Sequence, residues 1–530
     1  MNWILLIILP LFHACSFKKS DLKNQKVQGH EQLYSEPEAQ KESAALPKHK
    51  KRVVIVSTND WLGQFQAQTQ KFRDDHNKTE LQLTIGGIGI FSSYLKTIRE
   101  TYPSQTLLLD SGNFLPVGDF DEKIIRQAGE ILADLKYDAV TLGLQDFNRT
   151  PMAGETPESA LKSIIKGFKP PVLLSNMYDL KSGRVIEWQG TLPYLIKEVN
   201  GVKIGLIGLI PDDFVSLTPV QVRNGLYIEG MLQSTLRQSR LLRSLGAEIV
   251  IVMTHAGVIC GEEMAQELGL PLNKVNFETA KSDSCESTGL LAEYIQRLPS
   301  GVVDVLITGR HLQKTANKIN GVVVLSSFGK GQSFSLTELI YDKQTKQVEW
   351  NESKIHQPLL LCHDFFKESS DCYYEDPSID HGARSEALFW GKPVLKDVEI
   401  EKKFPLQSNK NDIESEDLKE MGDIIYYSNF SGETPIKLEI SGQRLFDSLN
   451  HAAASQTLHH WNNVILKSQA FYIKDEELDL TKTYSVVTSL EKMSSHLYLK
   501  KMISSPNLRL ISSSEILADE LQTIQAAPMP

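Results

Sequence analysis

Between Arg52 and about Tyr341, short apolar runs alternate with stretches of helical periodicity, and this alternation constrains the fold more than any other feature of the chain. Residues 158–168 and 230–245 carry apolar residues three and four positions apart, as amphipathic helices on a sheet do. The intervening apolar runs are VVIVST, TLLLDSG, AVTLG, PVLLSN, KIGLIGLI, EIVIVMTHAG, VDVLITG and GVVVLSS. This pattern predicts an α/β fold in which packed sheets are flanked by helices.

Several of these runs end in Gly, Asn, Asp or His, and the first ends in Asp60. Side chains at strand ends can converge on an ion or a ligand, because the backbone turns away there. Asp60 is followed by Trp61 and Leu62, and Leu62 has no lone pair to offer a metal.

The chain has 530 residues, which exceeds one ordinary core, so we expect two domains. The alternating region is assigned to 53–346. The charged and irregular segment 347–414 is predicted to be a joint between domains. Strand and helix patterns return over 415–522, which predicts a smaller α+β domain, and 523–530 is a tail.

The N-terminus is apolar over residues 1–14, which is too short to span a bilayer, and this stretch stops at Cys15. It resembles a bacterial lipoprotein signal, with lipid attachment at Cys15. An ordinary cleaved signal peptide and a buried N-terminal helix are the alternatives. Residues 15–52 are polar and without apolar periodicity, which predicts a flexible tether. We therefore expect a lipid-anchored protein of the bacterial cell envelope, on the periplasmic side or the surface, with the outer membrane favoured by Ser16.

Four cysteines remain when Cys15 is set aside, an even number for a chain that is expected to be exported. Two disulfides are the natural inference, and three pairings are open. The spacing favours bonds between cysteines that follow each other in the sequence, which would join Cys260 to Cys285 and Cys362 to Cys372. A zinc site is disfavoured because no second Cys or His lies two to four positions from any of them.

The formal net charge is −10, and no folded segment carries a basic stripe. Nucleic acid is therefore not an expected partner.

The strand ends follow a recognisable order of blocks: STND, GGIGIFSSYLKTIR, TLLLDSGN, LKYDAVTLGLQDFN, NGVKIGLIGLI, IVMTHAG, VDVLITGRH and SSFGKGQSFSLTEL. From Val53 to about Ile511 the chain resembles the calcineurin-like metallophosphoesterases, and within them the 5′-nucleotidase and UDP-sugar hydrolase branch. The resemblance implies a metallophosphoesterase α/β sandwich followed by a smaller 5′-nucleotidase C-terminal-like α+β domain. It also implies two divalent metal ions, manganese, zinc or similar, bridged by one carboxylate, with an Asn-His pair at the phosphate.

Most positions that the resemblance marks as metal ligands or catalytic groups are substituted. Asp60 and His255 match, whereas the bridging aspartate is Asn113, whose neutral amide is a far weaker ligand. The Asn-His pair is replaced by Leu144 and Gln145, which have no acid–base role near neutral pH. The remaining family histidines correspond to Leu62, Arg310 and Leu312, and shifting the alignment to use His311 restores one donor only.

We therefore expect no catalytic residue and no bound metal, with Asp60, His255 and Asn113 as vestigial ligand positions. Arg310 is predicted to form an ion pair or a hydrogen bond with Asp60 in the place of a metal, because an unpaired buried carboxylate is costly. The alternative is that Arg310 points to solvent and Asp60 caps a turn. Trp61 and Leu62 are predicted to fill the space that a metal would take.

The C-terminal region resembles the family's substrate domain at the level of framework sequence. Its Gly-Gly-x-Arg loop is missing, and a later Gly-rich segment is replaced by SSHLY. Weak candidates for substrate binding are Phe430 and Tyr498, as an aromatic clamp, and Arg384.

The sequence thus favours a catalytically degenerate 5′-nucleotidase-like lipoprotein that acts as a scaffold or binding protein without enzymatic activity. Its expected partners are the membrane, through the N-terminal lipid, and either a nucleotide or another envelope protein. One alternative is an active metal-dependent phosphoesterase, a phosphoric monoester hydrolase of 5′-nucleotidase type, acting on nucleotides or nucleotide sugars. Another is a nucleotide-binding receptor that does not hydrolyse its ligand.

Overall fold

The structure is a computed structural model of the whole chain, and it describes a defined subset of residues. These are 46–73, 80–116, 122–147, 154–214, 218, 224–258, 272–273, 285–286, 289–310, 314–367, 372, 384–403, 424–426, 435–441, 443, 445–446, 461–462, 464–467, 470–473 and 476–489.

The first sheet is built around β1 (Lys50–Thr58), which pairs in parallel with β4 (Thr106–Asp110) and antiparallel with β18 (Ser333–Asp342). Its strand order is β19-β18-β1-β4-β5-β6-β8. The further strands are β5 (Ala139–Val140), β6 (Val172–Leu173), β8 (Thr191–Leu192), β19 (Gln347–Val348), β20 (Lys354–Ile355) and β21 (Leu359–Leu360). The parallel register aligns Thr58 with Asp110, so the loops after β1 and β4 leave the sheet together.

The second sheet has the order β16-β17-β15-β12-β10-β9. Its four inner strands run parallel and its two edge strands run antiparallel to them. The strands are β9 (Leu195–Val199), β10 (Val202–Leu209), β12 (Ile249–Thr254), β15 (Val305–Ile307), β16 (Thr315–Ile319) and β17 (Val322–Ser326).

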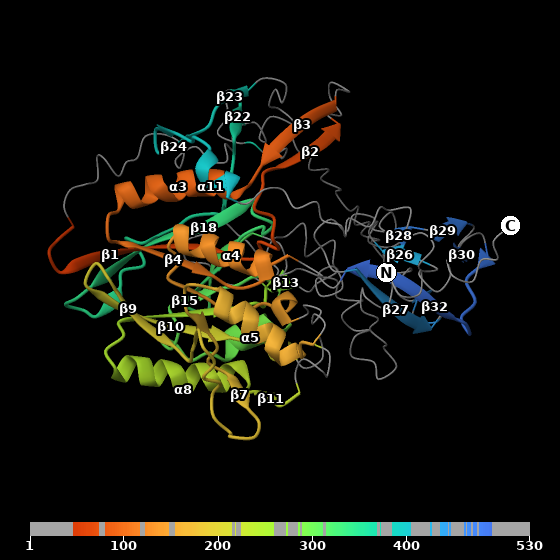
Figure 1. Cartoon of the computed structure of the whole chain (residues 1–530), viewed down its shortest axis with the longest axis horizontal. Helices are drawn as coiled ribbons and strands as arrows, with labels where there is room; N and C mark the ends of the chain where they lie inside the picture. Colours follow the sequence, from red (N-terminus) through yellow and green to blue (C-terminus); the bar gives the residue numbers. More distant parts are fainter. Residues whose placement is uncertain are drawn as a thin grey trace, which may run out of the picture.

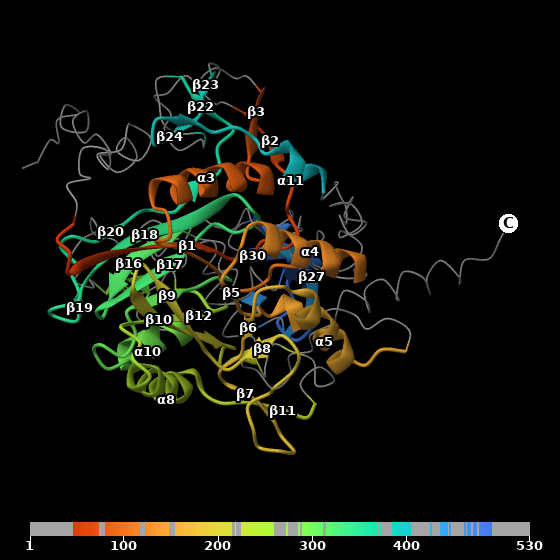
Figure 2. The ribbon, with the colours of Figure 1, turned by 60° about the vertical axis from the view of Figure 1, so that its left-hand side comes forward.

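The two sheets and their helices form four layers, seen from top to bottom in Figure 2. One apolar core lies between the sheets, where Ile55 and Leu107 of the first sheet join Ile251 and Ile307 of the second. The first sheet is covered by α3 (Ile88–Thr101), α4 (Glu122–Asp134) and α5 (Pro157–Gly167), and the second by α8 (Met231–Ser244) and α10 (Leu290–Arg297). Central strands are buried on both faces, which explains their unbroken apolar runs. The predicted α/β sandwich is confirmed.

The described part of 347–414 packs on α3 rather than leaving the first domain. It contains β22 (Asp364–Phe366), β23 (Arg384–Glu386), β24 (Leu388–Phe389), β25 (Lys392–Pro393) and α11 (Val398–Lys402). Ser92 of α3 donates to Asp397 at 3.0 Å, and the Tyr94 and Phe389 rings lie 4.8 Å apart. Above α3, β2 (Gln68–Arg73) and β3 (Glu80–Ile85) form a hairpin that projects from the sandwich in Figure 1.

The predicted disulfide between Cys362 and Cys372 is present. It ties the strand segment that follows β21 to the chain beyond β22. The predicted Cys260–Cys285 bond lies outside the described residues, because Cys260 is not among them.

The C-terminal strands lie beside the sandwich, at the right of Figure 1. They form one sheet in the order β27-β32-β26-β28 and another in the order β29-β30-β31. Their bounds are β26 (Ile424–Tyr426), β27 (Pro435–Ser441), β28 (Trp461–Asn462), β29 (Val464–Lys467), β30 (Ala470–Ile473), β31 (Glu476–Glu477) and β32 (Thr483–Ser489). This second unit fits the predicted smaller α+β domain. Across the described part of the chain, no helix combines the length and apolarity needed to cross a membrane.

Candidate functional site at the carboxyl ends of the strands

The loops that follow β1, β4, β12 and β15 meet where the carboxyl ends of the two sheets come together. Asp60 follows β1, Asn113 follows β4, His255 follows β12 and Arg310 follows β15. The first two loops run side by side, because the Asp60 N–H donates to the carbonyl of Gly112 at 2.9 Å.

Four non-glycine residues around this site have a positive φ. The angles are 50° at Asp60, 50° at Leu62, 58° at Asn113 and 82° at Arg310. Asparagine and aspartate tolerate this region, but for leucine and arginine it is a strained conformation that the surrounding structure must hold.

The Asp60 carboxylate is buried, with 2% of the residue exposed, and it accepts four hydrogen bonds. Its Oδ1 accepts from Asn113 Nδ2 at 2.9 Å and from His255 Nε2 at 2.7 Å. Its Oδ2 accepts from Asn59 Nδ2 at 3.0 Å and from the backbone N–H of Arg310 at 2.6 Å. A carboxylate has about four lone-pair sites, so this one is saturated by protein donors.

The partners of the Asn113 amide fix its orientation. Its Oδ1 accepts from the backbone N–H of Gln145 at 2.9 Å, and its Nδ2 donates to Asp60. A flipped amide would place NH₂ against the Gln145 N–H and oxygen against a carboxylate, which is unfavourable at both ends. Asn113 therefore presents a hydrogen, not a lone pair, to Asp60.

His255 is assigned the tautomer protonated on Nε2. Its Nδ1 faces the backbone N–H of Leu144 at 3.4 Å and accepts from it, so Nε2 carries the hydrogen that points at Asp60. Asn113 Nδ2 lies 2.8 Å from the same Nε2. The oxygen of Asp60 and the two nitrogens thus form a tight triangle.

Burial by itself raises the pKa of the Asp60 carboxyl, but the neighbouring groups outweigh it. The His255 imidazole and the N–H donors of Arg310 and Asn59 favour the ionised form, so the pKa of Asp60 lies below its usual value. The site is arranged around a carboxylate anion.

The ion pair predicted between Arg310 and Asp60 is wrong, because the guanidinium pairs with Asp213, and the hydrogen bond predicted as its alternative is made by the backbone N–H of Arg310 and not by its side chain. The Arg310 guanidinium donates through Nη1 to both oxygens of Asp213, at 3.0 and 2.9 Å. Only the backbone N–H of Arg310 reaches Asp60. His255 and three N–H donors satisfy the carboxylate instead, which leaves the guanidinium to a carboxylate nearer the surface, where 24% of the Asp213 side chain is exposed.

The two residues at the family's Asn-His positions are buried beside this cluster. Leu144 is 3% exposed and belongs to the apolar core on the α3 side of the first sheet. Gln145 opens the short 3-10 turn η2 (Gln145–Phe147) and supplies its backbone N–H to Asn113.

Two buried carboxyl groups next to the cluster were not identified from the sequence. Asp110 ends β4 and accepts from the Thr58 hydroxyl at 2.6 Å, and Asp146 accepts from the N–H groups of Asn113 and Gly143 at 3.0 and 2.8 Å. Burial raises the pKa of Asp110 well above its usual value and raises that of Asp146 to about 6, despite these hydrogen bonds. The available signal for Asp110 was its position at the end of β4, whereas Asp146 lies in the turn η2.

Trp61 belongs to the core rather than to this cluster. Its ring lies 5.7 Å from Phe65 and from Phe91 of α3, and 6.0 Å from Phe114. Leu62 is also buried, at 1% exposure. The predicted role of Trp61 in filling a metal pocket is therefore replaced by packing between the first sheet and α3.

The other candidate residues are located as follows. Arg384 begins β23, with its guanidinium 4.2 Å above the Phe366 ring. Phe430, Tyr498, Cys15, His311 and Leu312 lie outside the described residues. Within the described ranges, no group of three or more His, Cys, Asp or Glu side chains is arranged to hold a metal ion.

Comparisons with known proteins agree on the fold. A NAD nucleotidase (NadN) of Haemophilus influenzae gives a TM-score of 0.51 at 14% identity, covering 91% of this chain and 100% of that chain. A 5′-nucleotidase precursor of Thermus thermophilus gives 0.50 at 13% identity, covering 90% and 97%. The chain thus has the two-domain fold of 5′-nucleotidases, as the sequence resemblance implied.

The proteins that are similar in sequence match a smaller part of the chain than the solved structures do. Cell wall protein Lmo0130 of Listeria monocytogenes is 23% identical over 174 residues, which is 33% of this chain and 20% of that protein. The chain spans less than half the length of the curated relatives that it matches. No protein-family model matches the chain.

Proposed function

We propose that this chain is a catalytically degenerate protein of 5′-nucleotidase fold, which serves as a binding or scaffold protein of the cell envelope and does not hydrolyse phosphoesters. The observation that carries the proposal is the saturation of Asp60 by four hydrogen bonds. The activity that this chain is proposed to lack is the one for which the solved proteins of the same fold are named, a NAD nucleotidase and a 5′-nucleotidase precursor.

The residues do not fit two divalent cations. Such a pair, about 3.5–4 Å apart, needs several anionic or imidazole ligands with free lone pairs. The lone pairs of Asp60 are taken, and Asn113 is neutral and directs N–H groups inward. The nearby Asp110 carboxyl accepts one hydrogen bond on each oxygen, from the Thr58 hydroxyl and the Gly112 N–H, and burial raises its pKa well above its usual value, which disfavours the anionic form that a metal would need.

The groups that would act on a phosphate are also replaced. Leu144 has no polar side-chain atom, and the amide of Gln145 neither gives nor takes a proton near neutral pH. Each is buried, at 3% and 5% exposure. Among the residues that the structure describes, the positions that the resemblance assigns to the metal ligands and to the acid–base group thus offer neither two metal sites nor a proton donor, which supports the proposal.

A phosphoesterase with a single weakly bound metal is the second candidate. The observation that favours it is the convergence of Asp60 Oδ1 and His255 Nε2, two retained ligand positions, at 2.7 Å. Binding a cation there requires loss of the His255 proton from Nε2 and rotation of the Asn113 amide.

The cellular location is part of the proposal. The apolar residues 1–14 ending at Cys15 support export with a lipid anchor, and a cell wall protein among the relatives supports an envelope location. The proposed partners are a nucleotide or another envelope protein.

A hydrolysis assay tests the proposal. The purified chain is incubated with nucleoside monophosphates and UDP-glucose in the presence of manganese or zinc. The Asp60→Ala variant removes the retained ligand position, and Asp134→Ala, at an exposed position of α4, controls for purification and for substitution in general. We expect the wild type and Asp134→Ala to hydrolyse these substrates no faster than Asp60→Ala does. Turnover in the wild type and in Asp134→Ala that is lost in Asp60→Ala would show an enzyme.

A further inference from the structure

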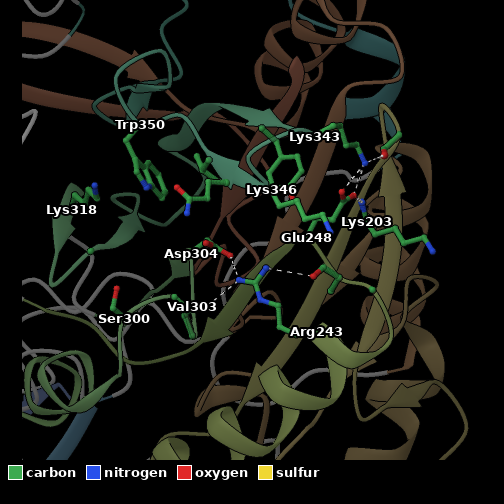
Figure 3. Close-up of a pocket in the computed structure, with 18 residues that line it drawn as sticks. Lys203, Arg243, Glu248, Ser300, Val303, Asp304, Lys318, Lys343, Lys346 and Trp350 are labelled. Carbon is green, nitrogen blue, oxygen red and sulfur yellow. Dashed lines mark hydrogen bonds and ion pairs between the residues drawn. The ribbon is translucent and has the colours of Figure 1, made fainter. Parts of the chain in front are cut away.

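A large cavity lies at the amino-terminal ends of the second sheet's strands, far from Asp60. Gly201, Glu248 and Asp304 line it, and these residues directly precede β10, β12 and β15. Its volume is about 960 Å³. Figure 3 shows the side chains that line it. Strand β12 has six residues and separates the two ends of the sheet by about 20 Å at 3.3 Å per residue. We call this space the amino-terminal cavity.

The amino-terminal cavity is lined by more positive than negative side chains. The acidic ones are Glu248 and Asp304. The basic ones are Lys203, Arg243, Lys318, Lys343 and Lys346. Five basic and two acidic groups leave a formal excess of three positive charges, although the whole chain carries −10. The cavity is therefore positive in a protein that is negative overall.

The two acidic side chains are already paired inside the cavity. Glu248 accepts from Lys343 at 2.6 Å, and Asp304 accepts from Arg243 at 2.6 Å. Lys203 and Lys346 have no carboxylate within ion-pair distance among the residues that the structure describes. Ammonium groups gathered in a concave site focus a positive potential, which attracts anions and raises their local concentration.

The opposite side of the cavity offers an aromatic surface. Trp350 is half-buried, and the Lys318 ammonium lies 4.5 Å from its ring centroid. Figure 3 shows Trp350 and Lys318 on one side of the cavity and Lys203, Glu248 and Lys343 on the other. A ligand that spans the cavity would meet Lys203 and Lys343 at one end and, at the other, the Trp350 indole together with the Lys318 ammonium.

We propose that the amino-terminal cavity binds a small organic polyanion that has two or more phosphate groups at one end and a planar ring at the other. A cavity of about 960 Å³ lies in the range of small-molecule sites and far exceeds one phosphate ion. Lys203 and Lys346 neutralise the phosphates, and the ring lies toward Trp350. This site is separate from the Asp60 cluster and does not depend on whether that cluster is catalytic.

Calorimetric titration with ATP and with inorganic pyrophosphate tests the proposal. The variant Lys203→Gln/Lys346→Gln removes the unpaired charges, and Lys169→Gln/Lys181→Gln removes two exposed lysines elsewhere as a matched control. We expect ATP affinity to fall at least tenfold in the first variant, to stay unchanged in the control, and to weaken with added salt. Absence of ATP binding, or an equal loss in both variants, would overturn the proposal.

Two further variants locate the ligand. Trp350→Leu is expected to weaken ATP binding several-fold while leaving pyrophosphate binding unchanged, because only ATP carries a ring. Arg310→Gln is expected to leave ATP affinity unchanged. If Arg310→Gln instead abolishes binding, the anion binds at the carboxyl ends of the strands and the amino-terminal cavity is not its site.

Discussion

The side-chain amide of Asn113 donates a hydrogen bond to Oδ1 of Asp60 at 2.9 Å, and so joins the loops that follow two neighbouring parallel strands. In the family that the sequence resembles, the position of Asn113 holds the carboxylate shared by two metals. A hydrogen-bond donor now stands where a metal ligand would stand. In this structure the Asn113 amide helps to neutralise the Asp60 carboxylate.

Replacing Asn113 with aspartate should destabilise the protein. Asn113→Asp places a second carboxylate within about 3 Å of Asp60 in a buried site and removes a donor, so we expect the free energy of unfolding to fall by about 3 kcal/mol. Denaturant titration without added metal measures it. Asn320→Asp is the matched control, because Asn320 also has a positive φ, 50°, and also donates through Nδ2, to the carbonyls of Ile295 and Leu298, but is exposed and does not face a buried carboxylate. Equal losses in the two variants would contradict the account.

The partner of Arg310 can be established with double-mutant cycles. Arg310→Gln combined with Asp213→Asn should show a coupling energy of about 1 kcal/mol, because the charged groups are in direct contact. Arg310→Gln combined with Asp60→Asn should be additive within about 0.5 kcal/mol, since only the backbone of Arg310 reaches Asp60. A larger coupling with Asp60 than with Asp213 would restore the sequence-based prediction.

Asp146 should make stability depend on pH. Its pKa is raised from 3.8 to about 6 in the folded protein, so between these values the folded state binds more protons than the unfolded state. The contribution of Asp146 to the free energy of unfolding is therefore greatest below pH 4. It falls by about 3 kcal/mol as the pH rises through 6. Asp146→Asn should remove that component. The measurement is the difference in unfolding free energy between wild type and variant across pH 4 to 7. A difference that does not change with pH would refute it.

The disulfide between Cys362 and Cys372 should contribute to stability. It closes a short loop, with a sequence separation of 10, which corresponds to about 3 kcal/mol in the chain-entropy treatment. The double variant Cys362→Ser/Cys372→Ser is preferable to a reductant, because a reductant would also act on any bond made by Cys260 or Cys285. Urea unfolding of the oxidised wild type and the double variant gives the difference. No loss of stability in the variant would contradict this expectation.

The sequence predicted the layers and the convergence of strand ends because both follow from local periodicity. Asp60, Asn113 and His255 come together since parallel strands bring their carboxyl ends to one edge, whatever the intervening sequence. The Cys362–Cys372 pairing was accessible for a similar reason, because its two members are close in the chain.

The partner of Arg310 was not accessible from the sequence. Asp213 and Asp60 are both aspartates near strand ends, and which one receives the guanidinium depends on the backbone at Arg310, whose φ is 82°. Trp61 was misassigned because the residue after Asp60 points to the other face, into the core under α3. Asp110 and Asp146 were overlooked because their importance comes from burial, which strand periodicity alone does not reveal.

The most direct test of the central claim is metal stoichiometry. The protein is purified without chelator, equilibrated with excess manganese, desalted, and measured by elemental analysis beside Asp60→Ala. Because every lone pair of Asp60 is held by a protein donor, we predict substoichiometric manganese, equal in the two proteins. Two manganese ions per wild-type chain, lost in Asp60→Ala, would contradict the account.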